Sequence, residues 1–201
     1  MDKYLVLGSA PYMSTWVDEH LNWFIDAGYR IICFNNSWKL VPAPMIYVWY
    51  HSTNFKSANT YVPTLSEIPS SKRINSSGNG KFNKLPVKKS NIPIPRDMYY
   101  ECKCGTMFLN VIYSLLGSYG SEANVVVVGC DMIYTKNGNT FYSDRPESRA
   151  HNDPLLKWGE TGLTKECEVS LEQYQKYGGT IRNASTCESR LPYPRFTDHL
   201  N

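Results

Sequence analysis

The chain has 201 residues and a formal net charge of +3 at neutral pH, a length that suits one domain with a full core and is short for two. No stretch is apolar for long enough to span a membrane, and the start of the chain lacks the basic region and long apolar core of a signal peptide. We therefore expect a cytoplasmic protein, with contact to a membrane surface left open.

The first fifty residues predict a strand, a helix and two further strands. Residues 4–7, 30–34 and 45–50 are short apolar runs. Between the first two runs, apolar residues recur at helical spacing, with Ser14 placed to cap the helix and Gly28 placed to end it. This order of strand, loop, helix, strand and strand is typical of the opening of a nucleotide-binding α/β sheet.

Residues 51–100 lose this periodicity and are strongly basic. They contain five prolines and hold eight Lys or Arg against two Asp or Glu. Because a long irregular stretch inside a compact domain is usually a functional lid or hides missed elements, we expect a lid or insertion with some short helices or strands. The charge favours an anionic partner, such as a phosphate, an acidic glycan, an anionic membrane or a nucleic acid. A solvated surface insertion is the equal alternative.

The second half of the chain predicts helices and strands in alternation. We expect a buried helix at 106–116, a strand at 125–128, an amphipathic helix at 164–177 and a last short strand at 180–182. The expected fold class is a single Rossmann-like α/β domain over 1–201. It has a mostly parallel sheet flanked by helices, and residues 51–100 form its lid or insertion.

The segment VVVVGCDMIYTKNGNTFY, residues 125–142, carries the clearest functional signal. Its four valines predict a strand buried on both faces, as in a parallel sheet, and such sheets bind ligands at the carboxyl ends of their strands. That end carries Asp131, Tyr134 and Tyr142. We expect Asp131 to orient a substrate hydroxyl or act as a base, with capping of the following turn as the conservative alternative.

Two other strand ends also carry candidate binding residues. Gly8-Ser9-Ala10-Pro11 lies between the first strand and the first helix, where backbone N–H groups favour phosphate. Asn35 and Asn36 end the second strand, and their amides can hold a ribose hydroxyl or a base edge, although asparagine is also common in turns.

Metal-binding motifs are missing from the sequence. It has no DxD and no HExxH, and Cys102 and Cys104 have neither the spacing nor the second pair of a zinc site. We expect no metal and no cofactor, so hydroxyls, amides and basic side chains must stabilise a leaving phosphate. His51 and His151 are the candidate general bases. His20, in a surface helix, and His199, in the tail, are poor candidates.

In their order along the chain, several short motifs resemble those of the bacterial family-42 sialyltransferases. They are Gly8-Ser9-Ala10-Pro11, Asn35, Cys104-Gly105-Thr106-Met107, Gly129-Cys130-Asp131 followed by Tyr134 and Tyr142, and Asn183-Ala184-Ser185. The resemblance implies a single nucleotide-binding domain with a lid, CMP-sialic acid as donor and no metal. It also implies that the two tyrosines hold the leaving phosphate and that a histidine is the base.

The resemblance places Gly105, Thr106, Asn183 and Ser185 among the substrate-binding residues. Ser9 stands where the family has asparagine.

The leading functional expectation is a metal-independent glycosyltransferase. It would move a sugar, sialic acid-like or other, from a nucleotide sugar to a hydroxyl of a glycan or another acceptor. One alternative is a nucleotide-dependent phosphotransferase or pyrophosphokinase on the same fold. Another is a protein that binds or modifies nucleic acid through residues 51–100. A homo-oligomer is compatible with each of these expectations.

Overall fold

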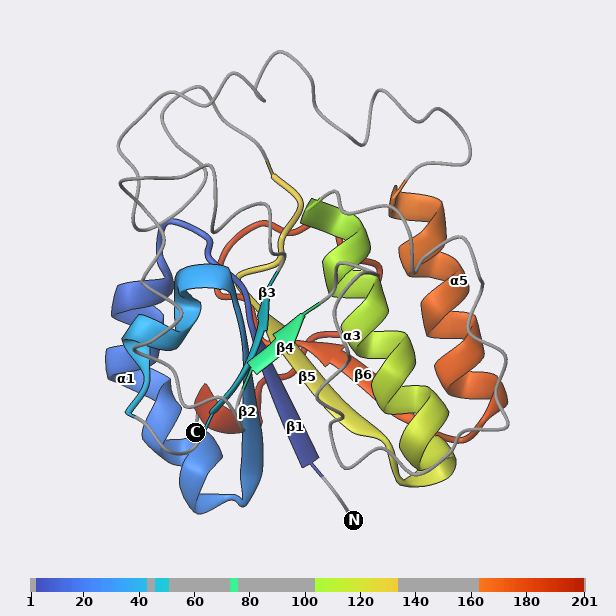
Figure 1. Ribbon diagram of the computed structural model, residues 1–201, viewed down its shortest axis with the longest axis horizontal. Coiled ribbons are helices and arrows are strands. Elements are labelled where there is room, and N and C mark those ends of the chain that lie inside the picture. Colours follow the sequence, from blue (N-terminus) through green and yellow to red (C-terminus); the bar gives the residue numbers. More distant parts are fainter. Residues whose placement is uncertain (1–2, 43–45, 51–72, 76–103, 134–162, 201) are drawn as a thin grey trace.

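The computed structural model describes residues 3–42, 46–50, 73–75, 104–133 and 163–200. These residues form alternating strands and helices that confirm the predicted α/β class (Figure 1). The elements are β1 (Lys3–Leu7), α1 (Met13–Asp26), β2 (Tyr29–Phe34), η1 (Asn35–Leu40), β3 (Ile46–Tyr50), β4 (Arg73–Asn75), α3 (Cys104–Tyr119), η5 (Gly120–Glu122), β5 (Asn124–Val128), α5 (Leu163–Lys176), β6 (Thr180–Asn183) and η8 (Asp198–Leu200).

The sheet has six strands in the order β4-β3-β2-β1-β5-β6, and every neighbouring pair is parallel. Strand β1 lies in the middle, where Lys3 pairs with Tyr29 of β2 on one side and with Asn124 of β5 on the other. Strand β4 falls within residues 51–100, which confirms that this basic stretch contains a short strand. The sheet is thus Rossmann-like and parallel throughout the described strands.

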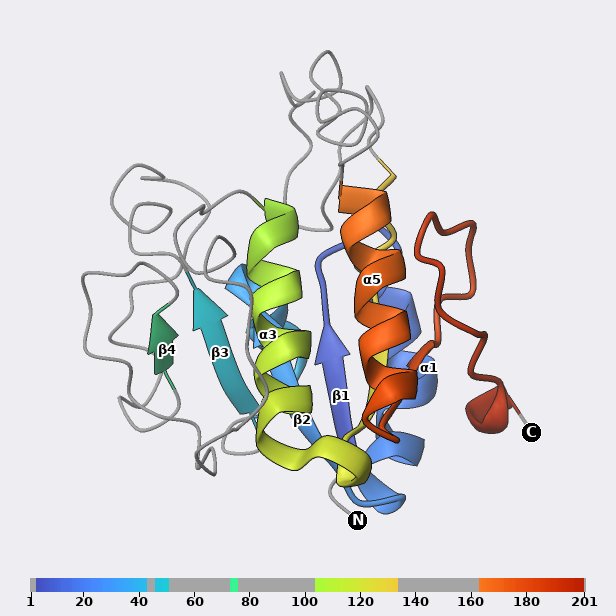
Figure 2. The same cartoon turned by 90° about the vertical axis from the view of Figure 1, so that its right-hand side faces the viewer.

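Helices cover both faces of the sheet. Helix α1 and the turn η8 lie on one face, whereas α3 and α5 lie on the other (Figures 1 and 2). Alternate residues of β1 point to the two cores: Tyr4 and Val6 pack with α3 and α5, and Leu5 and Leu7 pack with α1. This alternation follows from the two-residue period of a strand, and burial on both faces explains why the strands are continuously apolar.

The first helix begins differently from the sequence prediction. Tyr12 is its N-terminal cap residue, and no side chain makes a capping hydrogen bond, so the predicted cap by Ser14 is wrong. The other end is as predicted, because Gly28 follows the helix with φ of +80°. A residue without a Cβ adopts this left-handed conformation at little cost, which ends the helix cleanly.

An aromatic cluster joins α1 to the start of β2 and to the C-terminal segment, and it is formed by Trp16, His20, Trp23, Phe24, Tyr29, Phe196 and His199. His199 stacks on Phe196 and meets the ring of His20 edge-on, with 4.8 Å between the ring centroids. Although His199 lies in the C-terminal tail, its side chain is buried. Neither of its ring nitrogens has a hydrogen-bond partner among the described residues.

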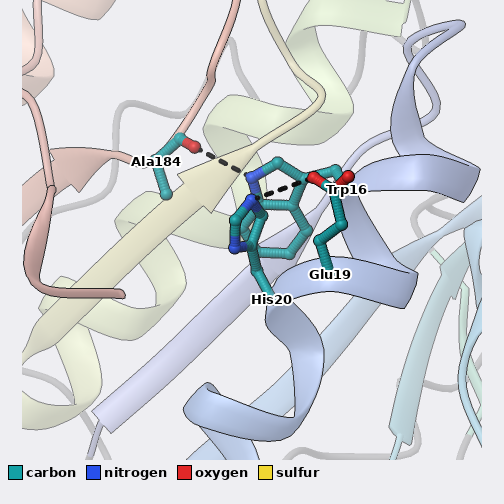
Figure 3. Close-up of polar contacts among 4 residues, drawn as sticks. All are labelled: Trp16, Glu19, His20 and Ala184. Carbon is teal, nitrogen blue, oxygen red and sulfur yellow. Dashed lines mark hydrogen bonds and ion pairs between the residues drawn. The ribbon is translucent and has the colours of Figure 1, made fainter. Parts of the chain in front are cut away.

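Helix α1 is also tied to the segment that follows β6. The indole N–H of Trp16 donates to the carbonyl of Ala184 at 3.1 Å, and the neighbouring His20 lies 3.5 Å from the Glu19 carboxylate (Figure 3). Since the indole bond is buried, it fixes the position of residue 184 relative to the helix.

A buried phenol joins the two helices of the opposite face. The hydroxyl of Tyr174 on α5 donates to the carbonyl of Ile112 on α3 at 2.5 Å. Replacing Tyr174 with Phe should lower the free energy of unfolding by about 1 kcal/mol, because one buried hydrogen bond is lost while the ring remains. Denaturant unfolding would measure it. Tyr177→Phe, directly after the same helix, is the matched control, and an equal loss in both variants would contradict the role of this bond.

In the part of the chain that the structure describes, we find no helix with the length and apolar character needed to cross a membrane.

Candidate functional site

The carboxyl ends of β1 and β5 form the point at which the strand order reverses. The chain runs from β1 to β2, β3 and β4 on one side, and β5 and β6 lie on the other side. In open parallel sheets, ligands bind outside the carboxyl ends of the strands at this point. The loops that begin at Gly8, Gly129 and Ala184, after β1, β5 and β6 respectively, therefore build the candidate site.

The first two of these loops are joined at their base. The N–H of Gly8 donates to the carbonyl of Val128 at 2.8 Å, and the N–H of Ala10 donates to the carbonyl of Gly129 at 3.1 Å. Pro11 has no N–H to offer. Of the four residues predicted to hold a phosphate, only Ser9 keeps its N–H free of such a backbone bond, so the prediction narrows to that residue.

The side chain of Tyr12 connects all three loops. Its hydroxyl donates to Oδ2 of Asp131 at 2.5 Å and lies 2.7 Å from Oγ of Ser185. The N–H of Gly129 donates to the same phenolic oxygen at 3.2 Å. Because the phenolic proton goes to Asp131, Ser185 is the donor in its contact with Tyr12. Tyr12 was not predicted as a site residue, and the structure places it at the centre of the predicted ones.

Burial and charge keep this phenol protonated. Removal from water raises the pKa of Tyr12 well above its ordinary value, and the nearby Asp131 carboxylate raises it further. At neutral pH the hydroxyl is therefore a neutral donor that is fixed on Asp131.

Asp131 is enclosed although it follows its strand directly. Its side chain is only 6% exposed. Its Oδ1 is buried and has no hydrogen-bond partner among the described residues. Its backbone carbonyl accepts a hydrogen bond from the N–H of Arg190 at 3.0 Å. The carboxyl group binds Tyr12, and the following turn that it is predicted to cap runs into residues outside the described part of the chain.

The backbone after Asp131 is strained. Met132 has φ of 56°, the left-handed region that residues with a side chain rarely adopt. Such residues cost about 1–3 kcal/mol and cluster at functional sites, where the surrounding structure holds them in place. This conformation therefore supports a functional reading of the loop that begins at Gly129.

The third loop holds Ser185 rigidly. Oδ1 of Asn183, which is buried, accepts a hydrogen bond from the N–H of Ser185 at 2.9 Å, so Asn183 shapes the turn. The guanidinium of Arg195 donates to the carbonyls of Ser185 and Cys187 and clamps the loop from outside. The structure thus brings Ser185 to Asp131 and gives Asn183 a supporting part.

Four predicted residues lie at the same edge of the sheet with only their backbone described. Asn35 and Asn36 begin η1 directly after β2, and Gly105 and Thr106 lie in the first turn of α3. That turn and the start of α5 both lie at the carboxyl edge of the strands (Figure 2).

The predicted residues His51, Tyr134, Tyr142 and His151 lie outside the described residues. They remain predictions of the sequence.

A metal site of ordinary composition is not formed by the described residues. Within 3–42, 46–50, 73–75, 104–133 and 163–200, no three His, Cys, Asp or Glu side chains gather so that they could hold an ion. The described part of the site offers hydroxyls, one carboxyl group and backbone N–H groups.

The fold and the site together define a Rossmann-like parallel α/β protein with a polar cluster at its topological switch point. No family model, no curated protein and no solved structure matches the chain.

Proposed function

We propose that the protein is a glycosyltransferase that moves a sugar from a nucleotide-activated donor to an acceptor hydroxyl. The observation that carries this proposal is the convergence of Tyr12, Asp131 and Ser185 at the switch point of a parallel sheet. Sheets of this kind bind nucleotides there. Three of the motifs that resemble family-42 sialyltransferases lie at these strand ends, and they favour sugar transfer over other nucleotide chemistry: Gly8-Ser9-Ala10-Pro11, Gly129-Cys130-Asp131 and Asn183-Ala184-Ser185.

In the proposed reaction, the acceptor hydroxyl attacks the anomeric carbon while the bond to the nucleotide phosphate breaks. His151 or His51 takes the proton of the acceptor. Tyr134, Tyr142 and the N–H of Ser9 donate hydrogen bonds to the departing phosphate, whose negative charge grows in the transition state. Asp131 orients a hydroxyl of the substrate.

The direct test is a thermal-shift panel with CMP, UDP, GDP and ATP, each with and without magnesium. A ligand that binds only the folded state raises the melting temperature, so the preferred base is read directly. We expect one nucleoside monophosphate or diphosphate to stabilise the protein without magnesium. No shift with any nucleotide at millimolar concentration would overturn the proposal.

Turnover tests the roles of the two tyrosines. Replacing both Tyr134 and Tyr142 with Phe should lower kcat by about 100-fold or more, because each lost donor weakens stabilisation of the leaving phosphate. Hydrolysis or transfer from the nucleotide sugar selected by the panel would be measured. Tyr177→Phe, directly after α5, is the control. Unchanged turnover in the double variant would remove these tyrosines from the mechanism.

The basic composition of residues 51–100 favours a second candidate, in which nucleic acid is bound or is the acceptor. Binding that depends on phosphate contacts weakens steeply with salt. The test measures binding of a single-stranded RNA and of a duplex DNA between 50 and 200 mM salt. An affinity that falls sharply over this range, without nucleotide-sugar turnover, would favour this candidate. A phosphotransferase would instead give a shift with ATP that requires magnesium.

A further inference from the structure

The carboxyl group of Asp131 is only half satisfied. Oδ2 accepts the short hydrogen bond from Tyr12, whereas Oδ1 is buried without a partner in the described part of the chain. Buried polar atoms almost always have a hydrogen-bond partner, and an unpaired oxygen of a carboxylate is among the most costly exceptions. A bare buried acceptor beside a strained residue is therefore a feature that needs an explanation.

The neighbouring polar groups do not supply the missing donor. The hydroxyl of Ser185 contacts the phenolic oxygen of Tyr12 and the carbonyl of Cys187, and the N–H of Gly129 donates to the same phenolic oxygen, so neither group bonds to Asp131. No described Lys, Arg or His forms an ion pair with Asp131; the ion pairs between described residues join His20 to Glu19 and Arg182 to Asp198. Among the described residues, the carboxyl group thus has one neutral donor and no ion-pair partner, and the nearby guanidinium of Arg190 donates to the carbonyl of Met132.

This environment selects the chemistry of a ligand. A phosphate at Oδ1 is excluded, since two negative charges in contact within the protein repel strongly. A divalent cation usually takes several charged or imidazole ligands, and no three His, Cys, Asp or Glu side chains gather among the described residues. A neutral hydroxyl satisfies the bare oxygen and adds no charge.

We propose that Oδ1 of Asp131 accepts a hydrogen bond from a hydroxyl of the sugar part of a bound nucleotide sugar, and that Tyr12 is the residue that positions this carboxyl group. The hydroxyl belongs either to the ribose or to the transferred sugar. This inference rests on the proposed function and adds to it the group that recognises the sugar.

Tyr12 suits the positioning role because its hydroxyl is fixed from three sides. By donating to Oδ2 it holds the plane of the carboxyl group and leaves Oδ1 as the free acceptor. Without the phenolic hydroxyl, the carboxyl group of Asp131 would lose its fixed orientation.

The experiment compares ligand binding in the wild type, Asp131→Asn and Tyr12→Phe by calorimetry. The probes are CMP, UDP and GDP, their 2′-deoxy and 3′-deoxy forms, CMP-sialic acid and UDP-glucose. We expect wild type to bind the preferred probe at least tenfold more tightly than its matched deoxy form. If instead the transferred sugar is the donor, the nucleotide sugar should bind at least tenfold more tightly than the free nucleotide.

The Asp131→Asn variant should lose this preference. Its carbonyl still accepts the bond from Tyr12, and its NH₂ then faces the ligand as a donor where an acceptor is needed. The affinities of this variant for the preferred probe and for its deoxy form should therefore agree within twofold. The ligand-free variant should melt at the same or a higher temperature than wild type, because a buried unpaired charge is removed. A merely structural role of Asp131 would lower that temperature. Tyr12→Phe should keep a reduced preference, about threefold.

Two results would overturn the inference. If nucleotides bind and Asp131→Asn keeps the full hydroxyl preference, Asp131 does not recognise the sugar, while the proposed function stands. If no probe binds to the wild type, the proposed function and this inference both fail. A folded Tyr12→Phe with unchanged preference would remove the positioning role alone.

Discussion

Replacing Gly8 with Ala should lower the free energy of unfolding by about 3 kcal/mol. A Cβ at this position would overlap the carbonyl oxygen of Gly129 and lie 2.6 Å from Sγ of Cys130. The N–H of Gly8 also donates to Val128, so the backbone cannot move away without breaking a bond between β1 and β5. Urea unfolding followed by circular dichroism would measure the loss.

Gly28→Ala is the matched control for this substitution. Gly28 has φ of +80°, but a Cβ there would meet nothing within 4 Å. The substitution therefore adds backbone strain without a clash, and we expect a loss of about 1 kcal/mol. The comparison separates the cost of the steric clash at Gly8 from the cost of the backbone strain at Gly28. Similar losses in both variants would show that the contact between Gly8 and Gly129 adjusts to the extra Cβ at little additional cost.

The second large effect is a loss of stability in mild acid. Burial, reinforced by the neighbouring His20, lowers the pKa of His199 from 6.5 to about 4 in the folded protein, although Asp198 opposes the shift. Between these two pKa values, the His199 side chain is therefore protonated in the unfolded chain and neutral in the folded protein. The resulting stability is fully present above pH 6.5 and is lost as pH falls toward 4.

We expect this histidine to contribute about 2 kcal/mol to the fall between pH 7 and pH 4. The full pKa shift would correspond to a larger loss of stability. The loss is smaller because η8 is a three-residue turn, so a small local opening returns the charged ring to water. His199→Phe keeps the stacked ring and removes the titration. Its stability should be equal or higher at pH 7, and its fall with acid should be smaller than in wild type. Parallel curves for the two proteins would refute the assignment.

The strands and helices could be predicted because their signals are local. The observed β1 and β5 each begin one residue before the predicted runs, and α5 lies within one residue of its prediction. Helix α3 extends beyond the predicted 106–116 at both ends, because Cys104 and Tyr119 carry no strong start or stop signal. A three-residue strand such as β4 has too few residues for any periodicity to identify it.

The centre of the site could not be predicted from local patterns. Tyr12 and Asp131 are 119 residues apart, and only the sheet order brings the ends of β1 and β5 together. The one available signal was the position of Tyr12, directly after the Gly8–Pro11 loop. The burial of His199 could not be predicted from local patterns either, because it depends on rings of α1 that lie far away in the chain.

The aromatic cluster on α1 has a consequence for synthesis of the protein. Phe24 is made about 170 residues before Phe196 and His199, its partners in the cluster. At the usual rate of about 5–20 residues per second, the aromatic rings of this helix stay without these two partners on the ribosome for roughly 10 to 30 s. Until Phe196 and His199 emerge, the nascent chain leaves tryptophan and phenylalanine rings incompletely covered, which suits binding by a chaperone that recognises exposed aromatic side chains.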